Sequence, residues 1–92
     1  MRQLAFSNNF IRQHAKLAIE ERAGVKDTLK NFTEALDNNE IRKGFGFKKL
    51  RTNVFEIRVD IRLRLLILEE NGQMVCHVVG THNDIENFLK NY

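Results

Sequence analysis

Apolar side chains occupy every second position from residue 55 to residue 67, which is the period of a β-strand. The positions are Phe55, Ile57, Val59, Ile61, Leu63, Leu65 and Ile67. A single strand over residues 54–68 would be about 50 Å long at ~3.3 Å per residue, whereas a domain of this size has a radius of gyration near ~13 Å. The segment must therefore fold back on itself, and Asp60 is its only turn-forming residue.

The register of this first hairpin follows from the side-chain pattern, because a one-residue slip sends every side chain to the opposite face. A two-residue loop at 60–61 would place Ile57 opposite Arg64 and mix apolar with charged side chains. A three-residue loop at 60–62 places Ile57 opposite Leu65 and gives one continuous apolar face. The pattern therefore predicts the three-residue loop.

A second hairpin is predicted at Asn71-Gly72, since this dipeptide between apolar runs is a strong signal for a two-residue turn. The three strands then form a meander with a shared apolar face. The predicted pairs are Ile67 with Cys76 and Leu65 with Val78 on that face, and Leu66 with His77 and Arg64 with Val79 on the other.

The opposite face of the predicted meander carries charged side chains. Arg58 lies across from Arg64, and Glu56 precedes Arg58 by two residues on the same face. Like charges directly opposite one another destabilise a sheet, so the facing arginines indicate an anion that contacts both. The alternative is a solvated polar face on which Glu56 neutralises the arginines diagonally.

A short strand at 3–6 and two helices precede the meander. The first helix is predicted over residues 9–22 and ends before Gly24, which suits the left-handed conformation found at helix ends. The second helix, over 25–36, has apolar residues at i, i+4, i+7 and i+11. Together these helices form a hairpin that packs on one face of the sheet.

A last helix follows the meander, with Asn83 as its cap and Glu86 three residues later in a box-like pattern. Its apolar stripe predicts packing on the edge of the sheet. The sequence thus predicts an α+β fold with a small antiparallel sheet, elements in the order β-α-α-β-β-β-α, and a helical hairpin packed on one face.

Residues 40–53 form a basic connection between the helices and the meander. It carries Lys48, Lys49 and Arg51, with glycine and phenylalanine alternating before them. Cations beside aromatic rings suit RNA, through phosphate contacts and base stacking. For the phenylalanines we favour anchoring to the core, and for some of the cations RNA binding.

Composition narrows the class of protein. Ninety-two residues make one domain, 1–92, with an ordinary hydrophobic fraction and a net charge of +3. The single cysteine, Cys76, excludes an internal disulfide and lies on the apolar face as a buried residue. No stretch is apolar enough for a signal peptide or a membrane span, so we expect a cytoplasmic protein without membrane contact.

Three short segments carry a resemblance to a known family. FEIRV at 55–59, LRLL at 63–66 and VGTH at 79–82, in this order of elements, resemble the RelE/ParE superfamily of bacterial type II toxin–antitoxin systems, in particular its endoribonuclease branch. The resemblance implies a RelE-like toxin domain over the whole chain. It also implies mRNA cleavage without a metal or any other cofactor, mostly on the ribosome, and inactivation by a cognate antitoxin.

Cleavage of RNA without a metal needs a base, an acid and cations around the phosphate. The charged face supplies Glu56 as the base, Arg58 and Arg64 as a phosphate clamp, and His82 as the acid. The resemblance places the same functions at these four positions. Further contacts to RNA or the ribosome are expected from Lys48, Lys49, Arg51, Arg62 and His77.

Two other functions remain open at this point. One is a non-enzymatic relative of the gyrase-inhibiting branch, since Asp84 and Glu86 follow His82 where active relatives carry aromatic or basic residues. The other is an adaptor that binds a partner through apolar residues of the charged face. These residues are Val54, Leu66, Leu68, Val75 and Val79.

Overall fold

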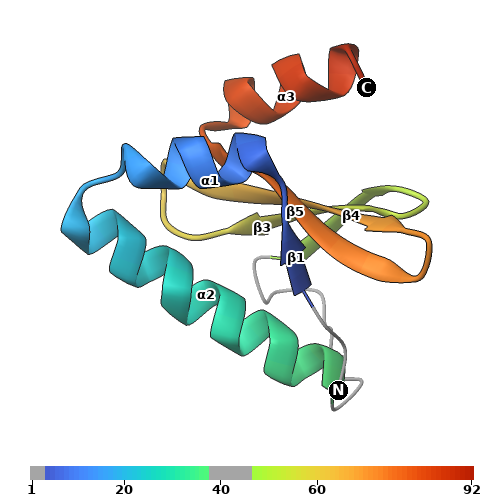
Figure 1. The fold of residues 1–92 in the computed structure, drawn as a ribbon, viewed down its shortest axis with the longest axis horizontal. Coiled ribbons are helices and arrows are strands. Elements are labelled where there is room, and N and C mark those ends of the chain that lie inside the picture. The colour runs from blue at the N-terminus through green and yellow to red at the C-terminus, as the bar shows by residue number, and fades with distance from the viewer. Residues whose placement is uncertain (1–3, 38–46) are drawn as a thin grey trace.

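The computed structural model describes residues 4–37 and 47–92, which form three helices and five strands (Figure 1). The elements are β1 (Leu4–Phe6), α1 (Asn8–Ala15), α2 (Ile19–Asp37), β2 (Phe47–Arg51), β3 (Val54–Arg58), β4 (Arg64–Glu70), β5 (Gln73–Gly80) and α3 (His82–Lys90). All five strands form one sheet in the order β1-β5-β4-β3-β2. The sheet was predicted to be antiparallel, but β1 runs parallel to β5, so the sheet is mixed. The other three strand pairs are antiparallel. The predicted α+β fold class is confirmed.

Strand β2 adds one strand to the predicted sheet and replaces the second half of the predicted connection. It pairs antiparallel with β3 and sets Lys48 opposite Glu56. The register shifts between Lys49 and Arg51, so Leu50 is an extra residue that breaks the strand period. This bulge and the two consecutive lysines interrupt the alternation of apolar and polar residues, so the sequence pattern did not predict the strand. Residues 38–46, with the first half of the connection, lie outside the described residues, as does residue 3 of the predicted first strand.

The break between α1 and α2 lies earlier than predicted. Helix α1 ends with Lys16 as its C-cap, and the Glu21 side chain accepts a hydrogen bond from the Ala18 N–H where α2 begins. Gly24, the predicted break, lies inside α2 instead. A Cβ at this glycine would lie 3.3 Å from Cγ1 of Val59, so the glycine serves the close approach of α2 to the end of β3.

The first hairpin has the predicted register. Ile57 pairs with Leu65, and Arg58 pairs with Arg64. In the connecting turn, Oδ1 of Asp60 accepts hydrogen bonds from the N–H groups of Arg62 and Leu63 at 2.8 and 2.7 Å. These bonds favour the ionised carboxylate and lower the pKa of Asp60.

The second hairpin turns at Asn71-Gly72 as predicted, with positive φ at both residues. Its register is correct at the pair Ile67–Cys76 and then shifts by one residue. The predicted pairs Leu65–Val78, Leu66–His77 and Arg64–Val79 are wrong, because a bulge at His77 gives Leu65–Val79, Leu66–Val78 and Arg64–Gly80 instead.

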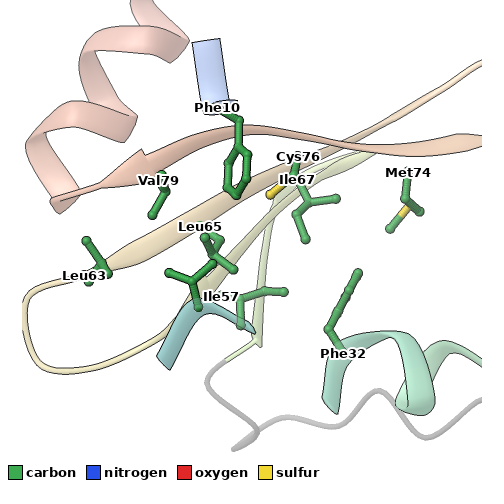
Figure 2. Packing of buried hydrophobic residues seen from close by; sticks show 10 residues of the cluster. Phe10, Phe32, Ile57, Leu63, Leu65, Ile67, Met74, Cys76 and Val79 are labelled. Atoms are coloured by element: carbon green, nitrogen blue, oxygen red, sulfur yellow. The ribbon is translucent and has the colours of Figure 1, made fainter. Parts of the chain in front are cut away.

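The sheet buries side chains on both faces, and the bulge determines which face Val78 and Val79 join. Helices α1 and α2 cover one face, where Cys76 and Val79 belong to the same buried cluster (Figure 2). Helix α3 covers the other face (Figure 1). On that face Val78 packs with Ile85. A regular strand would put Cys76 and Val79 on opposite faces, so the extra residue at His77 brings Val79 onto the α1–α2 face beside Cys76 and turns Val78 to the α3 face.

Helix α3 therefore packs on a face of the sheet and not on its edge as predicted. It covers Val54, Leu66 and Leu68, which the adaptor hypothesis had left exposed for a partner. Val79 is buried on the α1–α2 face, and Val75 is half-buried. The surface that the adaptor hypothesis required is thus core. None of the helices in the described part of the chain is long and apolar enough to cross a bilayer.

Candidate active site

A buried carboxylate lies at the centre of the α3-covered face. Glu56 of β3 is 5% exposed, and it is the only charged side chain among the buried residues of the described chain. Its Oε1 accepts a hydrogen bond from Nη1 of Arg64 at 3.2 Å. Its Oε2 is buried without a hydrogen-bond partner among the described residues. An unsatisfied buried oxygen is costly, so this atom is a candidate for a function beyond packing.

His82 faces this oxygen from the first residue of α3. Its Nδ1 lies 3.6 Å from Oε2 of Glu56, and its Nε2 lies 2.7 Å from Oε1 of Glu86, one helical turn further on. The helix start is fixed by a capping box, in which the Asp84 carboxylate accepts from the Thr81 N–H and the Thr81 hydroxyl accepts from the Asp84 N–H. The predicted box at Asn83 and Glu86 is therefore displaced by two residues.

The arginine pair is present as predicted, with Arg58 directly opposite Arg64 in the sheet. Arg64 is mostly buried and bound to Glu56, whereas Arg58 is exposed. The diagonal neutralisation of the alternative interpretation thus exists, but it is a largely buried ion pair and not a solvated one. Lys48 adds a third cation, since its position in β2 is directly opposite Glu56.

The remaining predicted contact residues lie in different places. Lys49 and Arg51 are exposed on the edge strand β2. Arg62 is in the turn between β3 and β4, where its guanidinium pairs with Glu21 of α2. The structure thus groups Glu56, Arg64 and His82 closely, with Arg58 and Lys48 beside them, and leaves Arg62 outside this group.

His77 belongs to a separate cluster at the other end of α3. Its Nε2 lies 3.1 Å from Oε1 of Glu70, its ring packs at a tilt of 34° against that of Phe88, and Oε2 of Glu70 accepts a hydrogen bond from the Tyr92 hydroxyl. The bond from His77, with a smaller contribution from Tyr92, lowers the pKa of Glu70. The Glu70 carboxylate in turn raises the pKa of Tyr92. These contacts anchor the end of α3 to the sheet.

Sequence reasoning missed Glu86 as a member of the site. The signal was its spacing of four residues from His82 on a predicted helix, which brings two side chains together. Cys76 is buried as expected, and burial raises the pKa of its thiol. In the described ranges, 4–37 and 47–92, no group of three or more His, Cys, Asp or Glu side chains is placed to hold a metal ion.

An apolar groove of about 540 Å³ lies on the opposite layer, between α1, α2 and β1. Its lining includes the exposed side chains of Phe6 and Ile11, and the charged residues among the lining are the cations Arg22 and Lys26. The full lining is Phe6, Phe10, Ile11, His14, Arg22, Ala23, Val25, Lys26 and Leu29. Such a surface is typical of protein interaction sites.

Comparison with known proteins gives matches in structure alone, since no family profile and no curated sequence matches the chain. A chain of the RelB–RelE antitoxin–toxin complex from Methanococcus jannaschii superposes with a TM-score of 0.66 at 16% identity, over 91% of this chain and 96% of that one. A chain of the YoeB–YefM complex from Staphylococcus aureus gives 0.62 at 17% identity, over 89% and 98%. YafQ from E. coli gives 0.62 at 19% identity, over 92% and 98%.

These matches cover nearly the whole chain and define its fold as that of the RelE-like toxins. The resemblance noted in the segments FEIRV, LRLL and VGTH is confirmed at the level of the fold. Within this fold, the chain combines a buried glutamate, a facing histidine and two arginines on one face of the sheet.

Proposed function

We propose that this protein is a RelE-like endoribonuclease toxin that cleaves mRNA on the ribosome and is neutralised by a cognate antitoxin. The observation that carries the proposal is the buried Oε2 of Glu56, which faces Nδ1 of His82 at 3.6 Å. A base and an acid side by side, with guanidinium groups next to them, are the groups that metal-free RNA cleavage requires.

Glu56 acts as the base in this proposal. Arg64 holds Oε1 and keeps the carboxylate in place, so that Oε2 takes the proton from the 2′-hydroxyl of the RNA. The resulting O2′ attacks the adjacent phosphorus and forms a P–O2′ bond as the P–O5′ bond breaks. The products are a 2′,3′-cyclic phosphate and a 5′-hydroxyl end.

His82 acts as the acid and completes the proton balance. Its Nδ1–H gives a proton to the departing O5′, while the proton taken by Glu56 returns to solvent. Arg58, Arg64 and Lys48 stabilise the additional negative charge on the phosphorane, because all three are positioned on or beside this face of the sheet.

The proposed dependence on the ribosome follows from the lack, among the described residues beside His82, of an aromatic side chain that could stack on the RNA base. Phe88, the nearest aromatic residue of α3, packs against His77 and the core and does not extend beside His82. Asn83, Asp84 and Glu86 surround His82 with polar and acidic groups. A partner that holds the mRNA would therefore provide the base positioning, and the exposed cations of β2 would contact its RNA.

An antitoxin is the proposed partner, as the matched RelE and YoeB structures were solved as complexes with RelB and YefM. The groove between α1 and α2 is its proposed docking surface. Its apolar floor suits the apolar face of a helix, and the rim cations Arg22 and Lys26 suit acidic residues beside that face. We therefore expect an antitoxin segment that is amphipathic and acidic.

Primer extension on an mRNA incubated with the purified protein tests the activity, with and without ribosomes. The comparison variant is Glu56→Gln combined with His82→Ala, with its fold checked by circular dichroism. We expect new 5′ ends only with ribosomes and wild-type protein, and at least a 10²-fold loss in the variant, as is typical when acid–base groups are removed.

Each other outcome has a definite meaning. Ends that form without ribosomes would make the protein a free ribonuclease. Ends that persist in the variant would contradict the assigned residues. Without any ends, the protein would act by binding alone, as in a gyrase inhibitor, and gyrase supercoiling would be the next assay.

A further inference from the structure

The side chain of Glu86 contacts the nitrogen of His82 that points away from Glu56. The distance between His82 Nε2 and Glu86 Oε1 is 2.7 Å, which is within hydrogen-bond range. The two residues are one turn apart on α3, and their side chains are 56% and 54% exposed. A histidine this exposed has freedom to rotate about its side-chain bonds unless a contact restrains the ring.

The contact decides which nitrogen is available for chemistry. A carboxylate accepts hydrogen bonds, so the atom that faces Glu86 must be an N–H donor. In the neutral ring this leaves Nδ1 without a proton and directed toward Oε2 of Glu56, 3.6 Å away. In the protonated ring, Nε2–H stays on Glu86 and the proton on Nδ1 is the one free to be transferred.

We propose that Glu86 is a positioning residue, which holds the His82 ring so that Nδ1 points at the reacting phosphate. A nucleophile or acid–base residue that is itself oriented by a third group is a general arrangement in enzymes. The catalytic half of this inference rests on the proposed ribonuclease function. The orientation of the ring is a separate statement that can be tested without any substrate.

The position of Glu86 favours a role in orienting His82 over that of a solvated surface glutamate. A solvated glutamate at this position would only repel a phosphate backbone, as its sequence context first indicated. In the structure its carboxylate is instead engaged by the imidazole at a short distance, on the side of the ring remote from Glu56. The RNA would therefore approach the Nδ1 side of the His82 ring, while the Glu86 carboxylate lies on the Nε2 side.

The first measurement is the ring tautomer of His82, by ¹⁵N chemical shifts of the full chain at a pH above the histidine titration range. The signals are assigned by their loss in His82→Gln. We expect the Nε2–H form in wild type and a mixture of tautomers in Glu86→Ala. The matched control is Glu34→Ala, which removes the same charge from an exposed position on α2 and should leave the tautomer unchanged.

A wild-type ring protonated at Nδ1, or a tautomer that does not respond to Glu86→Ala, would overturn the proposal. Glu86→Gln serves as the conservative variant, since its amide oxygen can still accept from Nε2–H. We expect it to retain the Nε2–H form.

Ribosome-dependent cleavage is the second measurement. We expect Glu86→Ala to lower the rate by roughly tenfold, below the 10²–10⁴-fold typical of removing a general acid, and Glu86→Gln to restore most of it. In the His82→Ala background the loss on Glu86→Ala should vanish, because a positioning residue has no effect without the group it positions. Faster cleavage by Glu86→Ala would contradict the proposal and make Glu86 an inhibitory contact. If the wild type cleaves nothing, the ribonuclease function fails, and the tautomer alone decides whether Glu86 orients the ring.

Discussion

The most informative single residue is Glu56, because the oxygens of a buried carboxyl group need hydrogen-bond partners. Arg64 satisfies one of its oxygens, and the other lies 3.6 Å from Nδ1 of His82 without a hydrogen-bond partner among the described residues. Replacing one member of a buried ion pair leaves the other charge uncompensated, and this costs more than the pair itself contributes.

Arg64→Ala should therefore lower the free energy of unfolding by about 2–3 kcal/mol, somewhat below the cost for fully buried pairs because Arg64 retains some exposure. Arg58→Ala is the matched control, since Arg58 is its exposed partner across the hairpin, and we expect a change within about 0.5 kcal/mol. Urea denaturation of the two variants measures the difference. Equal destabilisation would contradict a stabilising role of the buried ion pair between Arg64 and Glu56.

A second prediction concerns the hydrogen bond from the Tyr92 hydroxyl to Glu70. The folded pKa of Glu70 is below its usual value of 4.5, so its stabilising contribution is present above that pH and is lost as pH falls through the folded pKa. The folded pKa of Tyr92 is above 10.0, so its contribution is present below that pH and is lost as pH rises through the folded pKa. Thermal melts across the pH range should show a lower Tm for Tyr92→Phe than for wild type at pH values between the folded pKa of Glu70 and that of Tyr92. The difference should shrink at both ends, and a constant difference would contradict the assignment.

At the scale of elements, local chemistry made the two hairpin turns predictable. Asp60 caps its own turn, and Asn71-Gly72 takes up positive φ at both positions. The bulge at His77 was not predictable in the same way, because Val78 and Val79 are both apolar and either of them can face either buried side of the sheet. Strand β2 was missed since its own bulge interrupts the period, and the break after α1 was assigned to Gly24, which instead packs closely on Val59.

The part of the candidate site that lies on the strands was predictable from the sequence, because the strand register determines it. Glu56, Arg58 and Arg64 fall on one face by strand register, which the alternation determines. The contact between His82 and Glu86 depends on side-chain rotamers at the start of α3, and helical spacing alone gives only the possibility of such a contact.

The start of α3 yields a prediction of its own at Gly80. A Cβ at this position would lie 2.5 Å from Oδ2 of Asp84, the oxygen that accepts from the Thr81 N–H. Gly80→Ala should therefore displace the cap and lower stability by about 1 kcal/mol, the usual cost of a lost helix cap. The cost should be smaller in an Asp84→Ala background, where the displaced carboxylate is absent. Chemical denaturation of the two single variants and the double variant measures this coupling, and simple additivity would refute it.

At the scale of the whole molecule, the proposed active site and the proposed docking groove lie on opposite layers of the sheet. The site is on the face covered by α3, whereas the groove is lined by residues of β1, α1 and α2. Helix α2 lies on the other side of the sheet from α3 (Figure 1). An antitoxin helix in the groove would not itself cover Glu56. Neutralisation would then require a further segment that reaches around the sheet, or a clash between the antitoxin and the ribosome.

Ile11→Asp tests the groove, since this side chain is 55% exposed and lines it. A carboxylate in the apolar groove, facing the acidic helix proposed above, should weaken binding by at least tenfold in a titration with the proposed antitoxin. Ile19→Asp is the matched control, as this isoleucine is 76% exposed and lies outside the groove lining. Equal binding by both variants would place the antitoxin elsewhere.

The bulge at His77 also makes the site sensitive to chain length. Between Cys76 and Gly80 the strand holds one residue more than its partner strand, and this sets Gly80 opposite Arg64 at the point where α3 begins. A deletion of one residue there would move α3 about 3.3 Å along the sheet. A shift of this size exceeds the range over which a hydrogen bond can be kept. His82 would then lose its place beside Glu56 although every side chain of the proposed site was still encoded. A relative with one residue fewer between the positions of Cys76 and Gly80 should therefore have lost this arrangement of the proposed site, even if it keeps the same side chains.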